Sequence, residues 1–199
     1  MHLHLVRHGQ TSANSEDRYL GALDIGLNAR GHAQAQELRA KLPPGIEAVF
    51  VSPLLRAQQT AQIMFRNEAL RLQTSDAFRE RNVGVFEGLT QQQARERYPD
   101  LWSRNITRQW HAAPTNGESI ADVVSRVGAN LNAMIEARAG QVVVLVAHGF
   151  VAKTIRALAY QDFSDFFDWQ LGNGEVLELR LLDRVPLHLS HLERTLRTA

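Results

Sequence analysis

The amino-acid sequence predicts an α/β fold, in which a mostly parallel central sheet is covered by helices on both faces. Short apolar runs alternate with helical segments along the chain, which is the pattern of strands joined by crossover helices. The Val/Leu run at 141–146 is typical of a strand that is buried on both faces. With 199 residues, of which 44% are hydrophobic and 22% charged, the chain is expected to form one globular domain.

The first half of the chain alternates three apolar runs with two segments of helical pattern. The expected elements are strands at 3–6, 46–51 and 71–75, the last of them the weakest, and helices at 29–42 and 54–65. Ser52-Pro53 precedes the second helix, so Ser52 is expected to cap it and Pro53 to occupy its first position. Residues 11–28 and 76–88 are polar or contain glycine and are expected to be loops.

The second half is expected to complete the sheet. The expected elements are short helices at 89–98 and after Pro99, a long helix at 117–139, a strand at 141–146, a helix at 150–160 and a strand at 176–182. No internal repeat and no shift in composition marks a domain boundary. We therefore expect one domain over residues 1–182, with a cap segment at 89–116 inside it, followed by a C-terminal tail at 183–199.

Composition excludes several kinds of partner. Twenty-two Lys and Arg against 21 Asp and Glu give a formal net charge of +1, so no basic field attracts nucleic acid or an anionic membrane surface. The absence of cysteine excludes disulfides, a thiolate nucleophile and Cys-based metal clusters, and suits a reducing cytoplasm. The apolar run at 142–147 is too short to cross a bilayer, and residues 1–5 lack the length of a signal peptide. We expect a cytoplasmic protein whose partner is a small molecule, and a homodimer is left open.

Four expected strand ends carry side chains of chemical interest. Arg7 and His8 follow the first strand, Arg56 the second, Glu80 the third, and His148 the buried run. In a mostly parallel sheet these positions meet at one edge, where ligands bind in such folds. The two arginine forks suit a phosphate dianion, because charge-assisted bidentate hydrogen bonds are the strong ones.

These side chains supply the groups that phosphoryl transfer needs. The neighbouring Arg7 is expected to lower the pKa of His8, which keeps one ring nitrogen unprotonated for attack on phosphorus. His148 is expected to be a second phosphate ligand. Glu80 is expected to protonate the leaving oxygen, because like-charge repulsion from bound phosphate favours the protonated carboxyl group.

Each of these residues also has an ordinary structural interpretation. Taken alone, Arg56 fits a surface helix, His148 a core histidine bonded to the backbone, and Glu80 a carboxylate at a helix N-terminus. A lone Arg-His-Gly triplet is likewise a weak signal. The ordered set of strand-end residues is what favours a functional interpretation.

Several other residues are expected to have no catalytic role. His2 and His4 alternate on the first strand, but no carboxylate lies near them in the sequence to complete a metal site. No metal and no cofactor are expected, and Glu87 and Glu118 are expected to hold loops. The remaining residues considered are His188 and His191, which are still weaker metal candidates, and the core or interface aromatics Phe163, Phe166, Phe167 and Trp169.

The residues at the strand ends belong to a longer series of motifs. In chain order the series is Arg7-His8-Gly9-Gln10-Thr11, Asn14, Arg18-Tyr19-Leu20-Gly21, Asp24, Leu27, Gly31, Ser52-Pro53-Leu54-Leu55-Arg56-Ala57, Glu80, Gly84, Glu87-Gly88, Gly117-Glu118-Ser119 and Ala147-His148-Gly149. It resembles the histidine phosphatase superfamily, in its phosphoglycerate-mutase-like branch, over nearly all of residues 1–182. The resemblance implies a three-layer α/β/α sandwich of the phosphoglycerate-mutase type.

The resemblance also implies a phosphohistidine mechanism without a metal. By matching position, His8 takes up the phosphoryl group, and Glu80 donates a proton to the leaving group and later takes one from water. The residues that it implies at the bound phosphate are Arg7, Asn14, Gly21 through its backbone, Arg56, His148 and Gly149.

The superfamily includes mutases, which return the phosphoryl group to an organic acceptor, and phosphatases, which transfer it to water. Only 28 residues separate Gly88 from Gly117, and they contain no Arg-Arg pair, whereas the mutases carry a longer insertion with adjacent arginines. The chain also departs from common mutase residues at Leu20, Ala13, Ala22 and Phe86. We therefore expect a phosphomonoesterase. The alternatives are a cofactor-dependent phosphoglycerate mutase and a non-catalytic phosphate-binding relative.

Segment 89–116 is expected to form the roof that selects the leaving group, because loops beyond the strand ends carry specificity. It contains Tyr98, Trp102, Trp110 and four separate arginines, Arg95, Arg97, Arg104 and Arg108. Sugar phosphates, phosphoglycerate-like acids and ribazole phosphate are candidate substrates, and the sequence does not choose among them.

Overall fold

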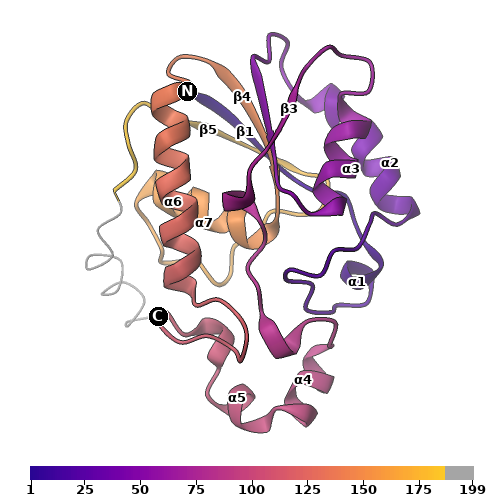
Figure 1. Cartoon of the computed structure of the whole chain (residues 1–199), viewed down its shortest axis with the longest axis vertical. Coiled ribbons are helices and arrows are strands. Elements are labelled where there is room, and N and C mark those ends of the chain that lie inside the picture. Colours follow the sequence, from indigo (N-terminus) through magenta and orange to yellow (C-terminus); the bar gives the residue numbers. More distant parts are fainter. Residues whose placement is uncertain (187–199) are drawn as a thin grey trace.

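A computed structural model of the chain describes residues 1–186 and has a five-stranded sheet at its centre (Figure 1). The strands are β1 (His2–Arg7), β2 (Ala48–Val51), β3 (Leu72–Thr74), β4 (Val142–Ala147) and β5 (Val176–Arg180). Their order is β3-β2-β4-β1-β5, with parallel pairing between neighbours except that β5 runs antiparallel to β1. The predicted mostly parallel sheet is confirmed.

Helices cover both faces of the sheet. Helices α2 (Ala29–Leu38) and α3 (Leu55–Met64) lie together on one face, and α6 (Ile120–Ala137) and α7 (Gly149–Tyr160) on the other (Figure 1). Side chains of β4 alternate between the two layers, because Val143 and Leu145 join the core beneath α6 and α7 while Val144 and Val146 join the core beneath α2 and α3. This alternation explains the uninterrupted apolar run and confirms the three-layer α/β/α sandwich.

The bounds of several elements differ from those expected. Helix α2 ends in a 3₁₀ turn at Arg39–Lys41, and the polar segment 11–28 contains a short helix α1 (Ser12–Ser15). A capping box between Thr11 and Asn14 stabilises α1, because each side chain accepts a hydrogen bond from the other's backbone N–H. So short a helix has too little apolar periodicity to be predicted.

The expected cap of α3 is wrong. The residue before the helix is Leu54, which makes no side-chain cap hydrogen bond, and Pro53 lies outside the helix. Ser52 is fully buried, and its Oγ accepts from Leu54 N–H at 3.3 Å but also lies 2.6 Å from His148 Nε2. The hydroxyl therefore belongs to the buried edge of the sheet, and the helix begins two residues later than the capping pattern indicated.

The segment between the third strand and α6 forms a small unit at one end of the molecule (Figure 1). This segment begins with two 3₁₀ turns at Asp76–Phe78 and Gly84–Phe86. They are followed by α4 (Gln91–Arg97), α5 (Pro99–Ser103) and a third 3₁₀ turn at Ile106–Arg108. The unit has its own apolar centre, made of Phe86, Leu89, Ala94 and Ile106. It is attached at the edge where the strands carry their functional side chains.

The end of the described chain packs against the domain. Val185 is buried, its N–H donates to Asn132 Oδ1 at 2.7 Å, and its carbonyl accepts from Asn132 Nδ2 at 2.9 Å. The third residue of the segment expected to be a tail is therefore held by α6, while His188 and His191 lie outside the described residues. No helix within residues 1–186 is long and apolar enough to cross a membrane.

Candidate active site

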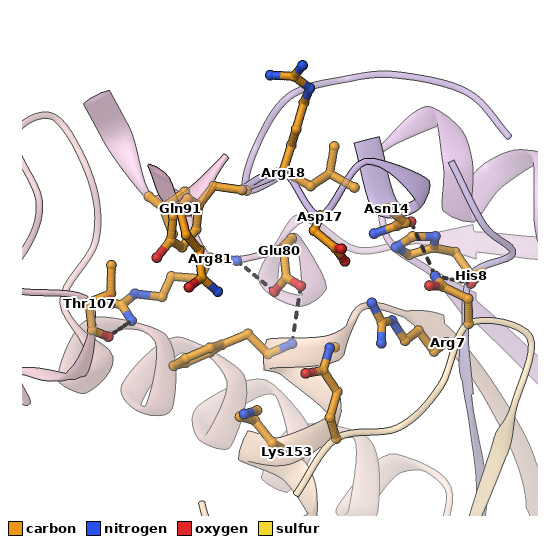
Figure 2. A pocket seen from close by; sticks show the side chains of 18 of the residues that line it. Arg7, His8, Asn14, Asp17, Arg18, Glu80, Arg81, Gln91, Thr107 and Lys153 are labelled. Atoms are coloured by element: carbon orange, nitrogen blue, oxygen red, sulfur yellow. Dashed lines mark hydrogen bonds between the residues drawn. The ribbon is translucent and has the colours of Figure 1, made fainter. Parts of the chain in front are cut away.

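The carboxyl ends of the parallel strands surround a cavity of about 560 Å³ (Figure 2). Arg7, His8 and Glu80 line this cavity, as do Asn14, Gly21 and Gly149. Arg56 and His148 are fully buried and lie beside His8. All eight residues that the sequence placed at the phosphate therefore lie in or beside one cavity.

Two glycines allow the segment after β1 to lie against the start of α2. A Cβ atom on Gly9 would lie 2.4 Å from Gly31 O, and one on Gly31 would lie 2.1 Å from Gln10 O. Either contact is too short for any side chain, so the backbone that carries His8 depends on both glycines. This approach fixes the direction in which His8 leaves the sheet.

Hydrogen bonding determines which nitrogen of His8 carries its proton. Nδ1 lies 2.7 Å from Gly9 O, and because a carbonyl oxygen only accepts, Nδ1 is the protonated nitrogen of the neutral ring. Nε2 is therefore unprotonated, and Arg56 Nε donates to it at 3.3 Å. His8 is 2% exposed, so this lone pair lies in a nearly water-free position.

Arg56 is held rigidly by the segment that follows α1. Its Nη1 donates to Leu23 O at 2.6 Å and its Nη2 donates to Gly21 O at 2.8 Å. Burial lowers the pKa of Arg56 to about 10, which leaves the side chain charged at neutral pH. With Nε directed at His8, two of the five N–H groups of the guanidinium remain for an anion.

Arg7 enters the cavity from the end of β1 and has fewer protein partners. Its Nη1 donates to Leu171 O at 2.5 Å, and its buried Nε has no hydrogen-bond partner among residues 1–186. A Cβ atom on Gly149 would lie 3.4 Å from Arg7 Cζ, so the glycine allows the guanidinium to lie against the start of α7. Arg7 and Arg56 together leave unused donors around His8.

His148 lies directly before α7 and contacts Ser52, whose importance the sequence did not indicate. Ser52 Oγ accepts from Leu54 N–H, and we assign its own proton to the hydrogen bond with His148 Nε2. That donation places the ring proton on Nδ1, which is buried and has no partner within residues 1–186. The ring centroids of His8 and His148 lie 5.1 Å apart, so this donor faces the same site.

Removing the Ser52 hydroxyl is expected to weaken the site without breaking the fold. In Ser52→Ala the ring of His148 loses the partner that fixes its proton, and we expect kcat/KM for a phosphomonoester to fall about tenfold. The ¹⁵N shifts of His148 should change from those of a ring protonated at Nδ1 to those of a mixture. Ser103→Ala, at an exposed hydroxyl bonded to Asp100 O, is the matched control. Unchanged ¹⁵N shifts in Ser52→Ala would contradict this assignment.

Burial holds both histidines in the neutral form. It is the largest cause that keeps the pKa of His8 well below 6.5, with Arg56 and Arg7 acting in the same direction. The pKa of His148 is lowered well below 6.5 by burial and then by Arg56, His8, Arg7 and Arg126. The lowered pKa expected at His8 is confirmed, although burial contributes more than Arg7.

These lowered pKa values make folding stability depend on pH. A buried neutral histidine binds its proton more weakly in the folded than in the unfolded chain, so stability is complete above pH 6.5 and falls as the pH drops below it. Between pH 7.5 and 5.5 we expect His8 and His148 each to remove about 1 kcal/mol from the unfolding free energy. Urea denaturation at both pH values measures this loss. It should be clearly smaller in the variant with both His8→Gln and His148→Gln, and an equal loss would contradict the assignment.

Glu80 lies across the cavity from His8 and is held by backbone groups (Figure 2). Its Oε1 accepts from Arg81 N–H at 2.9 Å, and its Oε2 accepts from Phe150 N–H at 3.1 Å in the first turn of α7. Arg126 fixes the segment that carries Glu80, because its Nη1 donates to Ala77 O and Arg79 O at 2.8 and 2.9 Å. The acid therefore has a fixed position despite lying outside regular secondary structure.

Glu118 and Glu87 hold loops in place, as the sequence predicted. Glu118 forms an ion pair with Arg126 at 2.8 Å and accepts from Asn82 N–H at 2.9 Å, which connects the start of α6 to the Glu80 segment. Glu87 Oε1 accepts from Ala22 N–H at 2.6 Å. A Cβ atom on Gly21 would lie 2.2 Å from the same oxygen, and the φ of Gly21 is +51°, so this position is suited to glycine.

Sequence reasoning missed several residues of the cavity. Asn173 joins two parts of the site, because its Nδ2 lies 3.1 Å from His8 O and 3.3 Å from Asn14 Oδ1. Arg81, Lys153 and Gln170 also line the cavity. Lys153 lies on a face of α7, and Gln170 and Asn173 lie in the irregular segment before β5. No sequence motif connects these residues to the predicted phosphate-binding residues.

The roof differs from the one expected. Of segment 89–116, only Gln91, Thr107 and Arg108 line the cavity. Tyr98 and Trp102 pack on the apolar centre of the cap, and Trp110 packs against Phe163 with ring centroids 5.8 Å apart. The exposed arginines of the cap are Arg95, Arg97, Arg104 and Arg108.

The aromatic residues near the C-terminus divide between core and site. Phe163 and Phe166 are buried in the main core, whereas Phe167 lines the cavity, so its assignment to core or interface was incomplete. Within residues 1–186 no three His, Asp or Glu side chains gather as metal ligands. His4 does have a carboxylate neighbour, Glu178 on the adjacent strand at 3.6 Å, but the two residues are far apart in the sequence, so no local pattern connects them.

Comparison with known proteins gives a family, relatives and solved structures. The family described as Histidine phosphatase superfamily (branch 1) matches residues 3–191. The bifunctional protein Rv2228c of Mycobacterium tuberculosis is 37% identical over 157 residues, which are 78% of this chain and 43% of the relative. The chain thus spans less than half the length of this relative.

Two further matches cover most of both chains. A 2,3-bisphosphoglycerate-dependent phosphoglycerate mutase of Methylobacterium radiotolerans is 34% identical over 191 residues, which are 92% of this chain and 86% of the relative. The crystal structure of the alpha-ribazole phosphatase from Shigella flexneri superposes with a TM-score of 0.83 at 27% identity, covering 92% of this chain and 96% of that one. The similarity therefore extends to both phosphatases and mutases.

Proposed function

Because the chain belongs to the histidine phosphatase superfamily (branch 1), we propose that it is a phosphomonoesterase that hydrolyses a small phosphorylated metabolite through a phosphohistidine on His8. One observation carries the proposal. The unprotonated Nε2 of His8 is buried beside two arginines that have unused N–H donors, and a carboxyl group faces it across the cavity. This is the donor set that a metal-free transfer of a phosphoryl group requires.

In the first step, Nε2 of His8 attacks phosphorus and forms the N–P bond while the bond from phosphorus to the leaving oxygen breaks. Arg7, Arg56 and Nδ1–H of His148 stabilise the negative charge on the phosphoryl oxygens. Glu80 donates its proton to the leaving oxygen, so the alcohol departs neutral. Gly9 O stabilises the positive charge that develops on His8 by accepting from Nδ1–H.

In the second step, water enters from the cavity and attacks the phosphohistidine. Glu80, now ionised, takes a proton from this water as the new P–O bond forms and the N–P bond breaks. The products are inorganic phosphate and the starting form of His8 and Glu80. The cavity in front of buried His8 has room for this water, which favours hydrolysis over return of the phosphoryl group to an organic acceptor.

The cap supports phosphatase rather than mutase activity. Of its four arginines, only Arg108 lines the cavity, whereas a mutase must hold a bisphosphorylated intermediate and exclude water. A mutase remains the second candidate, because of the 34% identity to the Methylobacterium enzyme. The presence of both His8 and Glu80 argues against a non-catalytic phosphate-binding protein.

The acceptor can be tested directly. The protein is incubated with 3-phosphoglycerate and a trace of 2,3-bisphosphoglycerate, and ³¹P NMR follows inorganic phosphate and 2-phosphoglycerate together. We expect release of phosphate with little 2-phosphoglycerate, because water reaches the phosphohistidine. Rapid isomerisation with negligible release of phosphate would replace the phosphatase assignment with that of a mutase. A panel of phosphorylated metabolites, with His8→Ala as the inactive control, extends the test to other substrates.

A further inference from the structure

The cavity contains a group of cationic side chains that the proposed mechanism does not use. Figure 2 shows Arg81 and Thr107 on the side of the cavity opposite Arg7 and His8, with Glu80 between them. Five cationic side chains line the cavity against two carboxylates, those of Asp17 and Glu80. Arg81, Lys153 and Arg108 are called the distal cations here.

Arg81 is the buried member of the distal cations. It is 2% exposed, and its Nε and Nη1 donate to Glu118 O at 3.0 Å and Thr107 O at 2.7 Å. Its Nη2 is buried and has no hydrogen-bond partner within residues 1–186. Burial lowers the pKa of Arg81 to about 10, so it is charged at neutral pH. A buried guanidinium nitrogen without a partner is costly unless an anion completes it.

Lys153 lies on α7 and is cationic without a carboxylate partner among the described residues. Its Nζ lies 6.0 Å from the ring centroid of Phe150, and Arg81 Cζ lies 5.0 Å from the same centroid. Burial is the largest cause that lowers the pKa of Lys153, and Arg108 and Arg7 act in the same direction, while Glu80 and Asp168 oppose them. Two cations therefore share one aromatic ring inside the cavity.

Arg108, from the cap, is the third distal cation and lies over a ring that belongs to the same aromatic cluster as Phe150. Its Cζ lies 5.0 Å from the centroid of the Phe167 ring, and Phe166 connects that ring to Phe150 with centroid separations of 5.5 Å to each. Glu80 offsets only part of this charge, because it is one carboxylate facing three cations. The distal end of the cavity is left with an excess of positive charge.

We propose that the distal cations bind a second anionic group on the substrate, a carboxylate or a second phosphate, while Arg7 and Arg56 hold the phosphoryl group that is transferred. This assignment rests on the proposed phosphatase function and specifies its substrate class: a phosphomonoester with an anionic leaving group. Arg81 and Lys153 are specificity residues in this assignment. Charge-assisted hydrogen bonds from them would orient the leaving oxygen towards Glu80.

Matched substrates test the second anion. 3-Phosphoglycerate and glycerol 3-phosphate differ in having a carboxylate or a hydroxymethyl group at the same position, and fructose 1,6-bisphosphate and fructose 6-phosphate differ by one phosphate. We expect kcat/KM to be at least about tenfold higher for the more anionic member of one pair. The pair that shows the preference identifies whether the group is a carboxylate or a phosphate. The preference should weaken as the salt concentration rises.

Substitutions test whether the distal cations cause the preference for the more anionic substrate. Lys153→Gln should reduce the ratio of kcat/KM within the preferred pair about tenfold, and Lys153→Arg should restore most of it because the charge returns. Arg108→Gln should have a smaller effect, since this arginine is exposed. Arg104→Gln, at an exposed cap arginine outside the cavity, is the matched control and should leave the ratio unchanged. A ratio near one in both pairs, or a preference that Lys153→Gln leaves intact, would overturn the assignment.

Nitrophenyl phosphate separates this inference from the proposed function. It has no second anionic group, so its hydrolysis tests the phosphatase function alone. If the protein hydrolyses it in a manner that depends on His8 but shows no preference in either substrate pair, the distal site is contradicted and the phosphatase function stands. If no phosphomonoester is hydrolysed, calorimetric binding of the same pairs still tests the site. Tighter binding of the more anionic member, weakened by Lys153→Gln, would support it, and equal binding would overturn it.

Discussion

In His8→Ala, turnover of every phosphomonoester is expected to fall by about 10⁴-fold or more, because no other side chain replaces the attacking nitrogen. His8 supplies the one unprotonated ring nitrogen beside Arg56, and its geometry depends on the Nδ1 contact to Gly9 O. His148 cannot take over the role, because its Nε2 contacts Ser52 at 2.6 Å. Steady-state release of phosphate from nitrophenyl phosphate and from an alkyl phosphate measures the loss.

The same residue should carry phosphate during turnover. Rapid quench in base, followed by mass spectrometry of peptides, should find an acid-labile phosphoryl group on the peptide that contains His8. His32→Ala, at an exposed histidine of α2, is the control and should retain both the activity and the label. Turnover that survives in His8→Ala, together with an unlabelled His8 peptide in the wild type, would exclude the phosphohistidine mechanism.

Glu80→Gln is expected to lower the hydrolysis of alkyl phosphates by about 10²- to 10⁴-fold, the usual contribution of general acid catalysis. Glutamine keeps the shape of the side chain, and its oxygen can still accept from Phe150 N–H, so the fold should be preserved. What is lost is the proton that the leaving alkoxide needs. Nitrophenolate is a stable leaving group, so phosphorylation of His8 by nitrophenyl phosphate should be affected much less.

The contrast between leaving groups is the decisive measurement for Glu80. Pre-steady-state bursts separate phosphorylation from hydrolysis of the intermediate, because Glu80 acts in both steps. Glu37→Gln, at an exposed glutamate of α2, is the control for loss of one carboxylate. An equal decrease in the phosphorylation rate on both substrate types would assign the acid role to another residue, with Asp17 the other carboxylate that lines the cavity.

The sequence by itself determined the layers of the fold and the centre of the candidate site. Alternating apolar runs and helical segments predicted the parallel sheet, and the parallel arrangement placed Arg7, His8, Arg56, Glu80 and His148 at one edge. The prediction succeeded because Arg7 ends its strand, His8 and His148 follow theirs directly, and Arg56 and Glu80 come soon after the strands before them. The direction of the chain through a parallel sheet is enough to bring such positions together, without any knowledge of side-chain packing.

Only the tertiary structure decided the contacts that cross between distant segments. Ser52 had the local pattern of a helix cap, but the fully buried His148, 96 residues away, shares its hydroxyl group. Arg81, Lys153 and Asn173 enter the cavity from a loop, a helix face and the segment before β5, where no local pattern marks them. Their positions depend on how α7 and the cap pack against the sheet edge. That packing is set by many apolar contacts at long sequence separation, so local periodicity and motif spacing do not record it.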